Sequence, residues 1–447
     1  MLNHTSPNFT IWKKTKFCAS ILENMGCFLR SSEFIAAHRV KPCDFTRNRL
    51  LTPDILIAFL LQMVGGRSLQ VGLDQFFSAL VDGATLVRVI TKSALSQARK
   101  KLLPSAIAAL GAMWVREWLA AVGEHKWHGF RVVAADGSCL RVPKWRETQD
   151  AYGLGPNGDG SVVMARVVGL LAVESNQMVH AEIGSYANGE RSLLVRALGA
   201  LSSGDLLVLD RGYPAWWLFA LLGRRGIAFC ARMDSCGCAS SQVKKFIRSG
   251  AAEQIIEHRL SGAALAKLAQ AGTEAGPSKL VRLRLIRVVL STGRIEVLAT
   301  SLLDTAAYPA ADFAALYHSR WRIEEAFKTL KCRLHLEGFT GELPHAIEQE
   351  IHAKILVANI TAALCTQAHE CLDEGKAAHY RVNQTVAIKH WSILAVAWIK
   401  GGAELLQQRV EELVALLKLS LEKLRPGRVC PRNFSVRGAQ RPRRAYQ

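Results

Sequence analysis

The pattern of hydrophobic and polar positions along the chain is helical up to about residue 125. Thr52 and Pro53 form an N-cap and first-turn pair that starts the clearest of these helices. Helices are predicted over 54–64, 73–80 and 94–102, and the last of them carries Arg99, Lys100 and Lys101. Short helices that end in a basic one are typical of a DNA-binding module, although a plain helical bundle with a basic, solvated face explains this segment equally well.

From Phe130 onward, short apolar runs indicate strands instead of helices. Strands are predicted over 131–136, 161–173, 178–186, 205–210 and 227–233, with helices over 190–201 and 213–225. Three strands followed by alternating helix and strand predict an α/β fold, in which helices cover a mixed five-stranded sheet.

The remaining pattern adds an insertion and a second helical region. Residues 280–290 partly alternate apolar residues with Arg, and 295–300 return as a strand, which predicts a β-rich insertion with an Arg-rich face. Helices are expected again over 309–333, 346–373, 382–399 and 403–424. The chain therefore divides into five predicted regions: a helical DNA-binding region (1–125), the first part of the core (126–233), the insertion (234–303), the second part of the core (304–375) and a helical C-terminal region with a basic tail (376–447).

Charge changes this picture, because 57 Lys and Arg residues against 37 Asp and Glu give a formal net charge of +20. Such a surplus favours a polyanionic partner over a merely soluble basic protein. The stretch 425–447 holds seven Arg and no acidic residue, so we expect it to contact polyanions.

The apolar stretches 55–64 and 213–223 are about half as long as the roughly 20 residues that span a bilayer. We therefore expect nucleic acid rather than membrane as the partner, and a cytoplasmic location.

Two aspartates come at the ends of predicted strands. Asp136 is followed by Gly137 and Ser138, and Asp210 by Arg211 and Gly212. Reactive groups of α/β proteins gather beyond the ends of strands, and two carboxylates from neighbouring strands suit Mg²⁺. Taken singly, however, an aspartate at a strand end is more often a cap or loop residue.

The predicted helix from Tyr317 to Lys331 gives a stronger signal. At about 100° per residue, Tyr317, Arg320, Glu324 and Lys331 fall within an arc of about 60°, and Lys328 borders it. The neighbouring acid Glu325 points about 100° away from Glu324. A carboxylate flanked by Arg, Tyr and Lys suits a metal ligand beside phosphate-binding groups, whereas the alternative is a solvated face with ion pairs one turn apart.

At these residues the sequence resembles the DDE transposases of bacterial insertion sequences, in the insertion sequence four family with its Y-x2-R-x3-E-x6-K signature. Tyr317, Arg320, Glu324 and Lys331 match that signature, and Asp136 in A-D-G-S and Asp210 in L-D-R-G-Y match the two family aspartates. The A-Y-G stretch near Tyr152, G-E-R-S near Glu190, S-x-x-R-K around Ser96 and R-P-G-R near Arg425 are also similar. The resemblance covers about residues 45–440.

The resemblance implies an RNase H-like core, interrupted by a β-rich insertion before the helix that carries the glutamate. It implies that Asp136, Asp210 and Glu324 are catalytic and bind two Mg²⁺ ions, with Mn²⁺ as a substitute. DNA contacts are expected from Tyr317, Arg320, Lys331, Trp321, Lys328 and Arg211. Trp321 fits base stacking and a core position equally well.

The implied function is cut-and-paste transposition by a homodimer that holds two DNA ends in a synaptic complex. Its DNA partners would be the terminal inverted repeats and the target.

The sequence departs from the family pattern at one tryptophan. Several relatives keep a tryptophan in the insertion for hairpin formation, whereas no Trp lies here between Trp217 and Trp321. Either another aromatic such as Trp216 takes that role, or the hairpin route does not operate. The alternatives are an inactive DNA-binding descendant of a transposase and another RNase H-like nuclease or resolvase.

Overall fold

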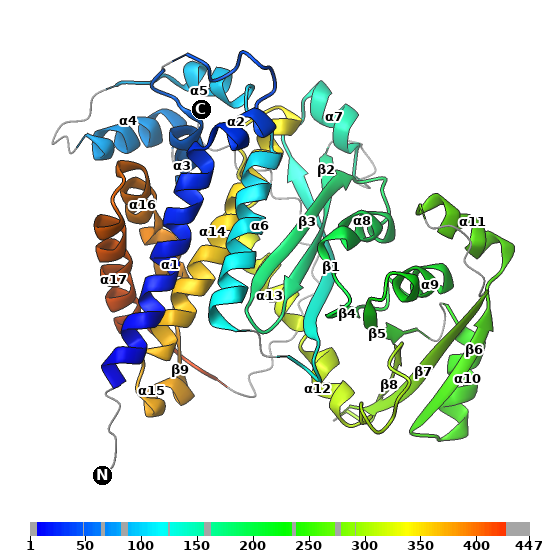
Figure 1. The fold of residues 1–447 in the computed structure, drawn as a ribbon. Coiled ribbons are helices and arrows are strands. Elements are labelled where there is room, and N and C mark those ends of the chain that lie inside the picture. The colour runs from blue at the N-terminus through cyan, green and yellow to red at the C-terminus, as the bar shows by residue number, and fades with distance from the viewer. Residues whose placement is uncertain are drawn as a thin grey trace, which may run out of the picture. The chain divides into compact units, whose positions relative to one another are not determined.

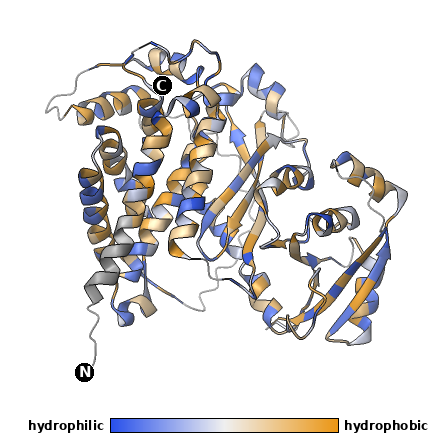
Figure 2. Cartoon of the chain, in the orientation of Figure 1, coloured by the Kyte–Doolittle hydropathy of each residue, from blue (hydrophilic) through white to orange (hydrophobic). Residues whose placement is uncertain are grey.

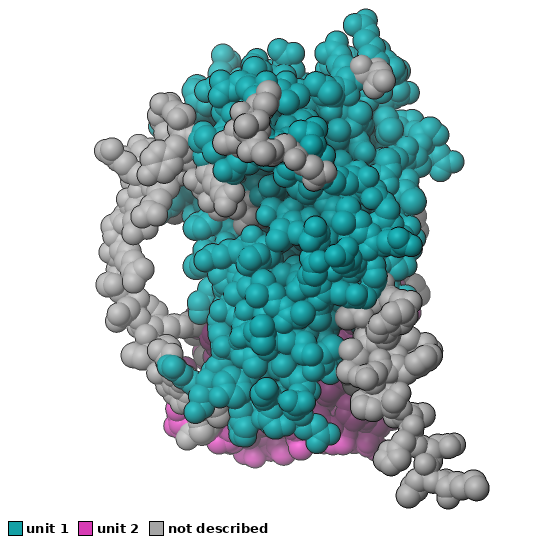
Figure 3. Space-filling model, turned by 90° about the vertical axis from the view of Figure 1, so that its left-hand side faces the viewer, with its two compact units in different colours: residues 1–123, 140–164, 328–447 teal, residues 124–139, 165–327 magenta. Residues whose placement is uncertain are grey.

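The computed structural model describes residues 7–47, 49–63, 68–81, 88–123, 126–155, 162–234, 238–272, 279–290 and 292–425, with side chains from residue 17 onward. The predicted basic tail beyond Arg425 lies outside these residues. The chain folds into two units, coloured separately in Figure 3. Unit 1 comprises Met1–Gly123, Leu140–Met164 and Lys328–Gln447, and unit 2 comprises Glu124–Cys139 and Ala165–Phe327.

Unit 2 is built on a mixed sheet in the order β3-β2-β1-β4-β5-β8-β7-β6 (Figure 1). Its strands are β1 (Arg131–Val142), β2 (Val163–Ala172), β3 (Gln177–Ser185), β4 (Asp205–Leu209), β5 (Ala228–Met233), β6 (Glu253–Arg259), β7 (Leu280–Val289) and β8 (Ile295–Thr300). The helices α8 (Glu190–Ala197) and α9 (Trp216–Arg224) pack on it. The predicted α/β fold and its five core strands are confirmed, and β4 is buried throughout because it lies in the middle of the sheet.

The register of the central strands fixes the positions of the two aspartates. Strands β1 and β4 run parallel, with Ala135 paired to Leu209. Asp136 and Asp210 are the next residues on these neighbouring strands, so both carboxylates emerge at the same edge of the sheet.

The two strands predicted in the insertion, β7 and β8, pair as an antiparallel hairpin, and this hairpin extends the core sheet. β8 pairs antiparallel with β5, and β7 and β6 follow, together with α10 (Ser240–Ser249) and α11 (Gly262–Gln270). This pairing covers the edge that β5 would otherwise expose. The sequence pattern missed β6, α10 and α11, and Figure 2 shows mostly hydrophilic colours along β6, the outermost strand.

The arginines of β7 have partners within unit 2. Arg284 is buried and binds the carboxylate of Glu253 and the backbone oxygen of Tyr308. Arg287 donates to backbone oxygens at the end of α10, among them that of Ile247 at 2.7 Å. These two arginines are therefore held by hydrogen bonds within unit 2.

Unit 1 is helical and centres on α14 (Pro344–Glu370), which is buried on nearly all sides. The helices that pack on it include α1 (Pro7–Arg30), α3 (Pro53–Gln62), α6 (Ser105–Val122), α16 (Gln384–Lys400) and α17 (Ala403–Leu419). The shorter elements are α2 (Ser32–His38), α4 (Leu69–Leu80), α5 (Lys92–Arg99), α7 (Arg146–Tyr152), α15 (Glu374–His379), β9 (Tyr380–Val382) and β10 (Leu421–Lys423). The helix expected over 403–424 thus ends at Leu419, because the following residues pair with β9.

The apolar helix α6 is longer than the apolar stretches noted in the sequence. Among the described residues, α6 alone is long and apolar enough to cross a membrane. It contains Arg116 and Glu117, and it packs against α14 and α1 within unit 1. The core helix of a soluble protein passes the same test, so this feature is weak evidence for a membrane span.

The basic residues near the end of α5 do not form one exposed patch. Arg99 is 4% exposed, and its guanidinium binds residues at the start of α14, including Glu350 at 2.9 Å and Gln349 at 3.1 Å. Lys100 is exposed. Arg99 therefore does not lie on a basic, solvent-facing surface of this helix, because the buried carboxylate of Glu350 holds it inside unit 1.

Candidate active site

The site in unit 2 begins with two aspartates, Asp136 in the middle of β1 and Asp210 just after β4. The expectation that Asp136 ends its strand is wrong, because β1 continues to Val142 beyond the residues that pair with β4. Asp136 accepts a hydrogen bond at 2.9 Å from the backbone N–H of Gly137. Asp210 accepts one at 3.0 Å from the hydroxyl of Tyr317, a residue that lies 107 positions further along the chain. The tertiary fold thus brings the first part of the signature to the second aspartate.

The signature segment is not the single helix that the sequence predicts. It consists of α12 (Asp312–His318), a tight turn at Ser319 and Arg320, α13 (Trp321–Lys328) and a π-helical turn, η2 (Thr329–Arg333). The turn forms because Ser319 donates to the backbone oxygen of Leu316 at 2.6 Å and the backbone N–H groups bond three residues back. A constant step of 100° therefore fails at Ser319 and again after Lys328. Lys331 belongs to unit 1, and its DNA contact stays a prediction.

Arg320 lies at the centre of the acidic residues. Its Nη2 donates to Glu324 at 2.7 Å, its Nη1 is 3.7 Å from Asp136, and the residue is 4% exposed. The guanidinium also lies over the rings of Tyr317 and Trp321. The structure therefore brings Asp136, Asp210, Glu324, Tyr317 and Arg320 together, because Arg320 touches two of the acids and Tyr317 the third.

Burial and crowding shift the protonation of Asp136. Burial raises the pKa of this carboxyl to about 6, against opposing effects of Arg320 and of the Gly137 N–H. The nearby carboxylates of Glu324 and Glu190 raise the pKa further. Asp136, Glu324 and Glu190 thus place three carboxylates in a partly buried space beside Arg320.

The side chains of the site are of the type that binds a divalent cation, but they do not converge on a single point. Within the described ranges, no three acidic, histidine or cysteine side chains converge closely enough to hold a metal. The available donors are carboxylate oxygens, which Mg²⁺ and Mn²⁺ prefer. The raised pKa of Asp136, caused mainly by burial and in smaller part by Glu324 and Glu190, shows that its negative charge is poorly compensated. A bound cation would compensate this charge, so Asp136, Asp210 and Glu324 fit such an ion.

Three of the other predicted DNA contacts are exposed in this structure. Trp321 is 42% exposed, which removes the alternative that it is a core aromatic. Arg211 and Lys328 are exposed as well, whereas Lys331 is half-buried. Trp216 stacks on His258, with 3.9 Å between ring centroids, so one of its faces is covered.

Two residues at the site were not among the predicted functional residues. Glu190, the first residue of α8, and Tyr213, just after β4, both interact electrostatically with Asp136. Their signal was present, since Glu190 lies in G-E-R-S and Tyr213 in L-D-R-G-Y. The motifs alone did not show that these side chains face the aspartates.

Known proteins that are similar to this chain include two transposases. The chain is 23% identical over 289 residues to "Transposase InsG for insertion sequence element IS4" of Escherichia coli (strain K12). That match covers 61% of this chain and 60% of that protein's length. A piggyBac transposase, solved by cryo-EM in a synaptic complex with hairpin DNA, aligns with a TM-score of 0.45 and 10% identity over 93% of this chain and 84% of that one.

A family model described as "Transposase DDE domain" matches residues 127–360, which is more than half of the chain. The matched range contains Asp136, Asp210 and Glu324. The chain therefore belongs to the DDE transposase family, as its motifs predict.

Proposed function

We propose that this protein is a transposase that binds the terminal inverted repeats of an insertion sequence and catalyses metal-dependent DNA cleavage and strand transfer. One observation carries the proposal: Asp136, Asp210 and Glu324 gather around Arg320 and Tyr317 where the pairing of β1 with β4 ends. The core of unit 2 would then be RNase H-like, with the five strands β1 to β5 as its sheet.

The three carboxylates would hold two Mg²⁺ ions, or Mn²⁺ in their place. Such ions, when bound, polarise phosphate oxygens and ease the ionisation of an attacking hydroxyl. The protein's own residues position the carboxylates: the Tyr317 hydroxyl fixes Asp210, and Arg320 fixes Glu324. At neutral pH most Asp136 side chains are ionised, because their pKa of about 6 lies below 7.

The DNA would be held by basic and aromatic side chains around these acids. Arg320 would place its positive charge beside a phosphate bound at these carboxylates, and its Nε has no hydrogen-bond partner among the described residues. Exposed Arg211 and Lys328 would add phosphate contacts, and exposed Trp321 would stack on a base. We further propose Lys331 as a phosphate contact, a homodimer as the active assembly and the cytoplasm as the location.

A second candidate function, an inactive DNA-binding descendant, requires DNA binding without cleavage. The intact set of three carboxylates disfavours this second candidate.

The deciding experiment incubates the purified protein with Mg²⁺ and a labelled duplex that carries the ends flanking its own gene. Nicks at the element boundary would support the transposase, whereas binding without any cut in Mg²⁺ or Mn²⁺ would overturn the catalytic proposal.

DNA affinity is expected to fall steeply with salt, because the formal net charge of +20 favours phosphate contacts that release counterions. For six or more such contacts, the affinity should drop about a thousandfold between 50 and 200 mM salt. Fluorescence anisotropy with the same duplex measures this slope. A flat binding curve would contradict the electrostatic part of the proposal.

Asp136→Asn is expected to stabilise the protein in the absence of divalent cations. The folded state raises the pKa of Asp136 from 3.8 to about 6, so the folded protein holds this proton more tightly than the unfolded chain. The contribution of Asp136 to stability should therefore fall as the pH rises from about 4 to about 6, by up to about 3 kcal/mol. The difference in stability between the wild type and the variant should change by this amount. Urea unfolding in EDTA at pH 4, 5, 6 and 7 measures both. A variant less stable than the wild type at pH 7 would mean that the Asp136 charge favours folding.

A further inference from the structure

The carboxylate of Glu190 lies directly over the backbone next to Asp136. A Cβ atom placed on Gly137 would lie 2.5 Å from both the Cδ and the Oε1 of Glu190. Real Cβ atoms do not approach other atoms so closely, so only glycine at position 137 leaves room for this carboxylate. The glycine after the first aspartate therefore creates a space that an acid from α8 fills.

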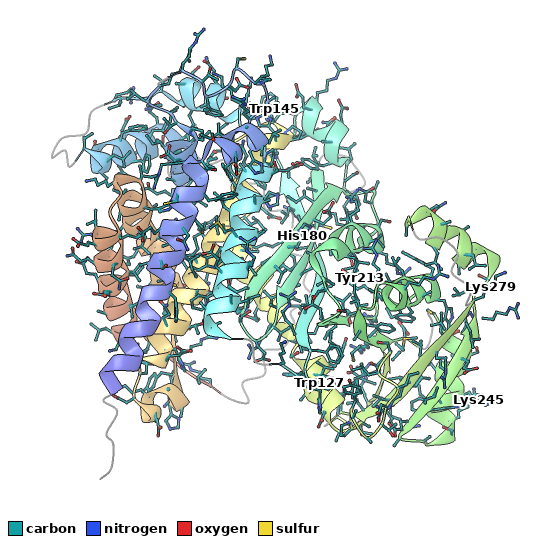
Figure 4. The ribbon with its side chains drawn as sticks, viewed as in Figure 1. Trp127, Trp145, His180, Tyr213, Lys245 and Lys279 are labelled. Atoms are coloured by element: carbon teal, nitrogen blue, oxygen red, sulfur yellow. The ribbon has the colours of Figure 1, made fainter. Side chains whose placement is uncertain are left out.

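A buried hydroxyl faces the same acids. Tyr213 is 1% exposed, and its hydroxyl has no hydrogen-bond partner in the structure. Its electrostatic neighbours are Glu190, Asp136 and Asp210, and Figure 4 labels it near α8 and the ends of β1 and β4. Because an unpaired buried hydroxyl costs free energy, a ligand that accepts or donates a hydrogen bond there is expected.

The position of this hydroxyl relative to Glu190 is fixed by the adjacent residue of α8. Arg191 donates from Nε to the backbone oxygen of Tyr213 at 3.0 Å and from Nη2 to that of Pro214 at 3.2 Å. The loop after β4 and the start of α8 are thus tied together. Glu190 and Tyr213 are therefore held next to each other by the backbone contacts of Arg191.

We infer that Glu190 is a fourth acidic residue of the site, which binds a hydrated divalent cation together with Asp136, and that the Tyr213 hydroxyl bonds to this cation's water. This inference rests on the proposed function, because it assumes that Asp136 binds a divalent cation. It extends that function, since it adds a carboxylate from α8 and assigns a role to Gly137.

The test measures Mn²⁺ binding to the full-length protein without DNA, by electron paramagnetic resonance of free Mn²⁺. Glu190→Gln keeps the side-chain shape and removes the charge, while Gly137→Ala fills the space and displaces the Glu190 carboxylate. We expect both to weaken Mn²⁺ binding about tenfold. Glu325→Gln, an exposed acid on α13, is the matched control and should bind Mn²⁺ as the wild type does.

Tyr213→Phe separates a role in ligand binding from a structural role. Because the hydroxyl has no partner in the protein, its removal should leave the melting temperature equal or higher, while Mn²⁺ binding weakens several-fold. A lower melting temperature with unchanged Mn²⁺ binding would show that the hydroxyl is structural, and would overturn its assignment.

Asp136→Asn distinguishes failure of the inference from failure of the proposed function. If Asp136→Asn loses Mn²⁺ binding while Glu190→Gln and Gly137→Ala retain it, Glu190 is not a ligand, although the proposed metal site stands. If the wild type binds no Mn²⁺, or if Asp136→Asn has no effect, both the inference and the metal-dependent function fail.

Discussion

Glu324→Gln is expected to abolish DNA cleavage while leaving DNA binding within a few-fold of the wild type. The substitution removes one negative charge from the carboxylates around Arg320 without removing a basic group. Loss of one electrostatic group at a reacting centre costs about a hundredfold to a thousandfold in rate. Boundary nicking in Mg²⁺ and anisotropy binding, both with the element-end duplex, measure the two effects.

The neighbouring acid on the same helix is the control for this result. Glu325 is exposed, and in the wild type it is Glu324 that receives the hydrogen bond from Arg320 at 2.7 Å. Glu325→Gln should therefore cleave at close to the wild-type rate. If Glu325→Gln were inactive and Glu324→Gln active, the assignment of the third acid would be wrong.

Arg99→Met is expected to destabilise unit 1 by about 3–5 kcal/mol, because it leaves a buried carboxylate without its ion-pair partner. Glu350 is 2% exposed and lies 2.9 Å from the Arg99 guanidinium. Burial alone would raise the pKa of Glu350, but Arg99, Lys354 and Thr340 outweigh it and hold the pKa below its usual range. Urea unfolding at pH 7, followed by tryptophan fluorescence, measures the loss.

Lys100→Met separates this structural effect from DNA binding. Lys100 is exposed beside Arg99, so its substitution should change the free energy of unfolding by less than about 0.5 kcal/mol. Any effect of Lys100→Met should instead appear in DNA affinity. An Arg99→Met variant of unchanged stability that binds DNA more weakly would contradict this structural role and make Arg99 a DNA-contacting residue.

The local pattern predicted the central elements of the fold well. Apolar runs of strand length identified β1 to β5. The acids that follow the runs 131–135 and 205–209 marked the site, because these two runs pair in parallel register and so bring Asp136 and Asp210 side by side. The spacing of the signature identified Tyr317, Arg320 and Glu324 as neighbours. The assumed single helix is broken at Ser319, but the break still leaves Tyr317 bonded to Asp210 and Arg320 bonded to Glu324.

Contacts between distant segments were beyond the sequence pattern. The pairing of β8 with β5 joins the insertion to the core sheet, and local alternation cannot reveal which strand becomes a neighbour. The burial of Arg99 depends on Glu350, which lies 251 positions away, so the basic helix end by itself did not show that Arg99 is buried. The partners of the β7 arginines were hidden for the same reason.

The sequence by itself therefore determined the α/β class, the two aspartates and the signature residues, because strand periodicity and residue spacing are local properties. Only the tertiary structure decided which charged side chains meet. It placed Arg320 among the acids, Tyr317 on Asp210, and Glu190 in the space left by Gly137. The physical reason is that burial and ion pairing depend on residues far apart in the chain, and these interactions set the charge, and hence the chemistry, of the site.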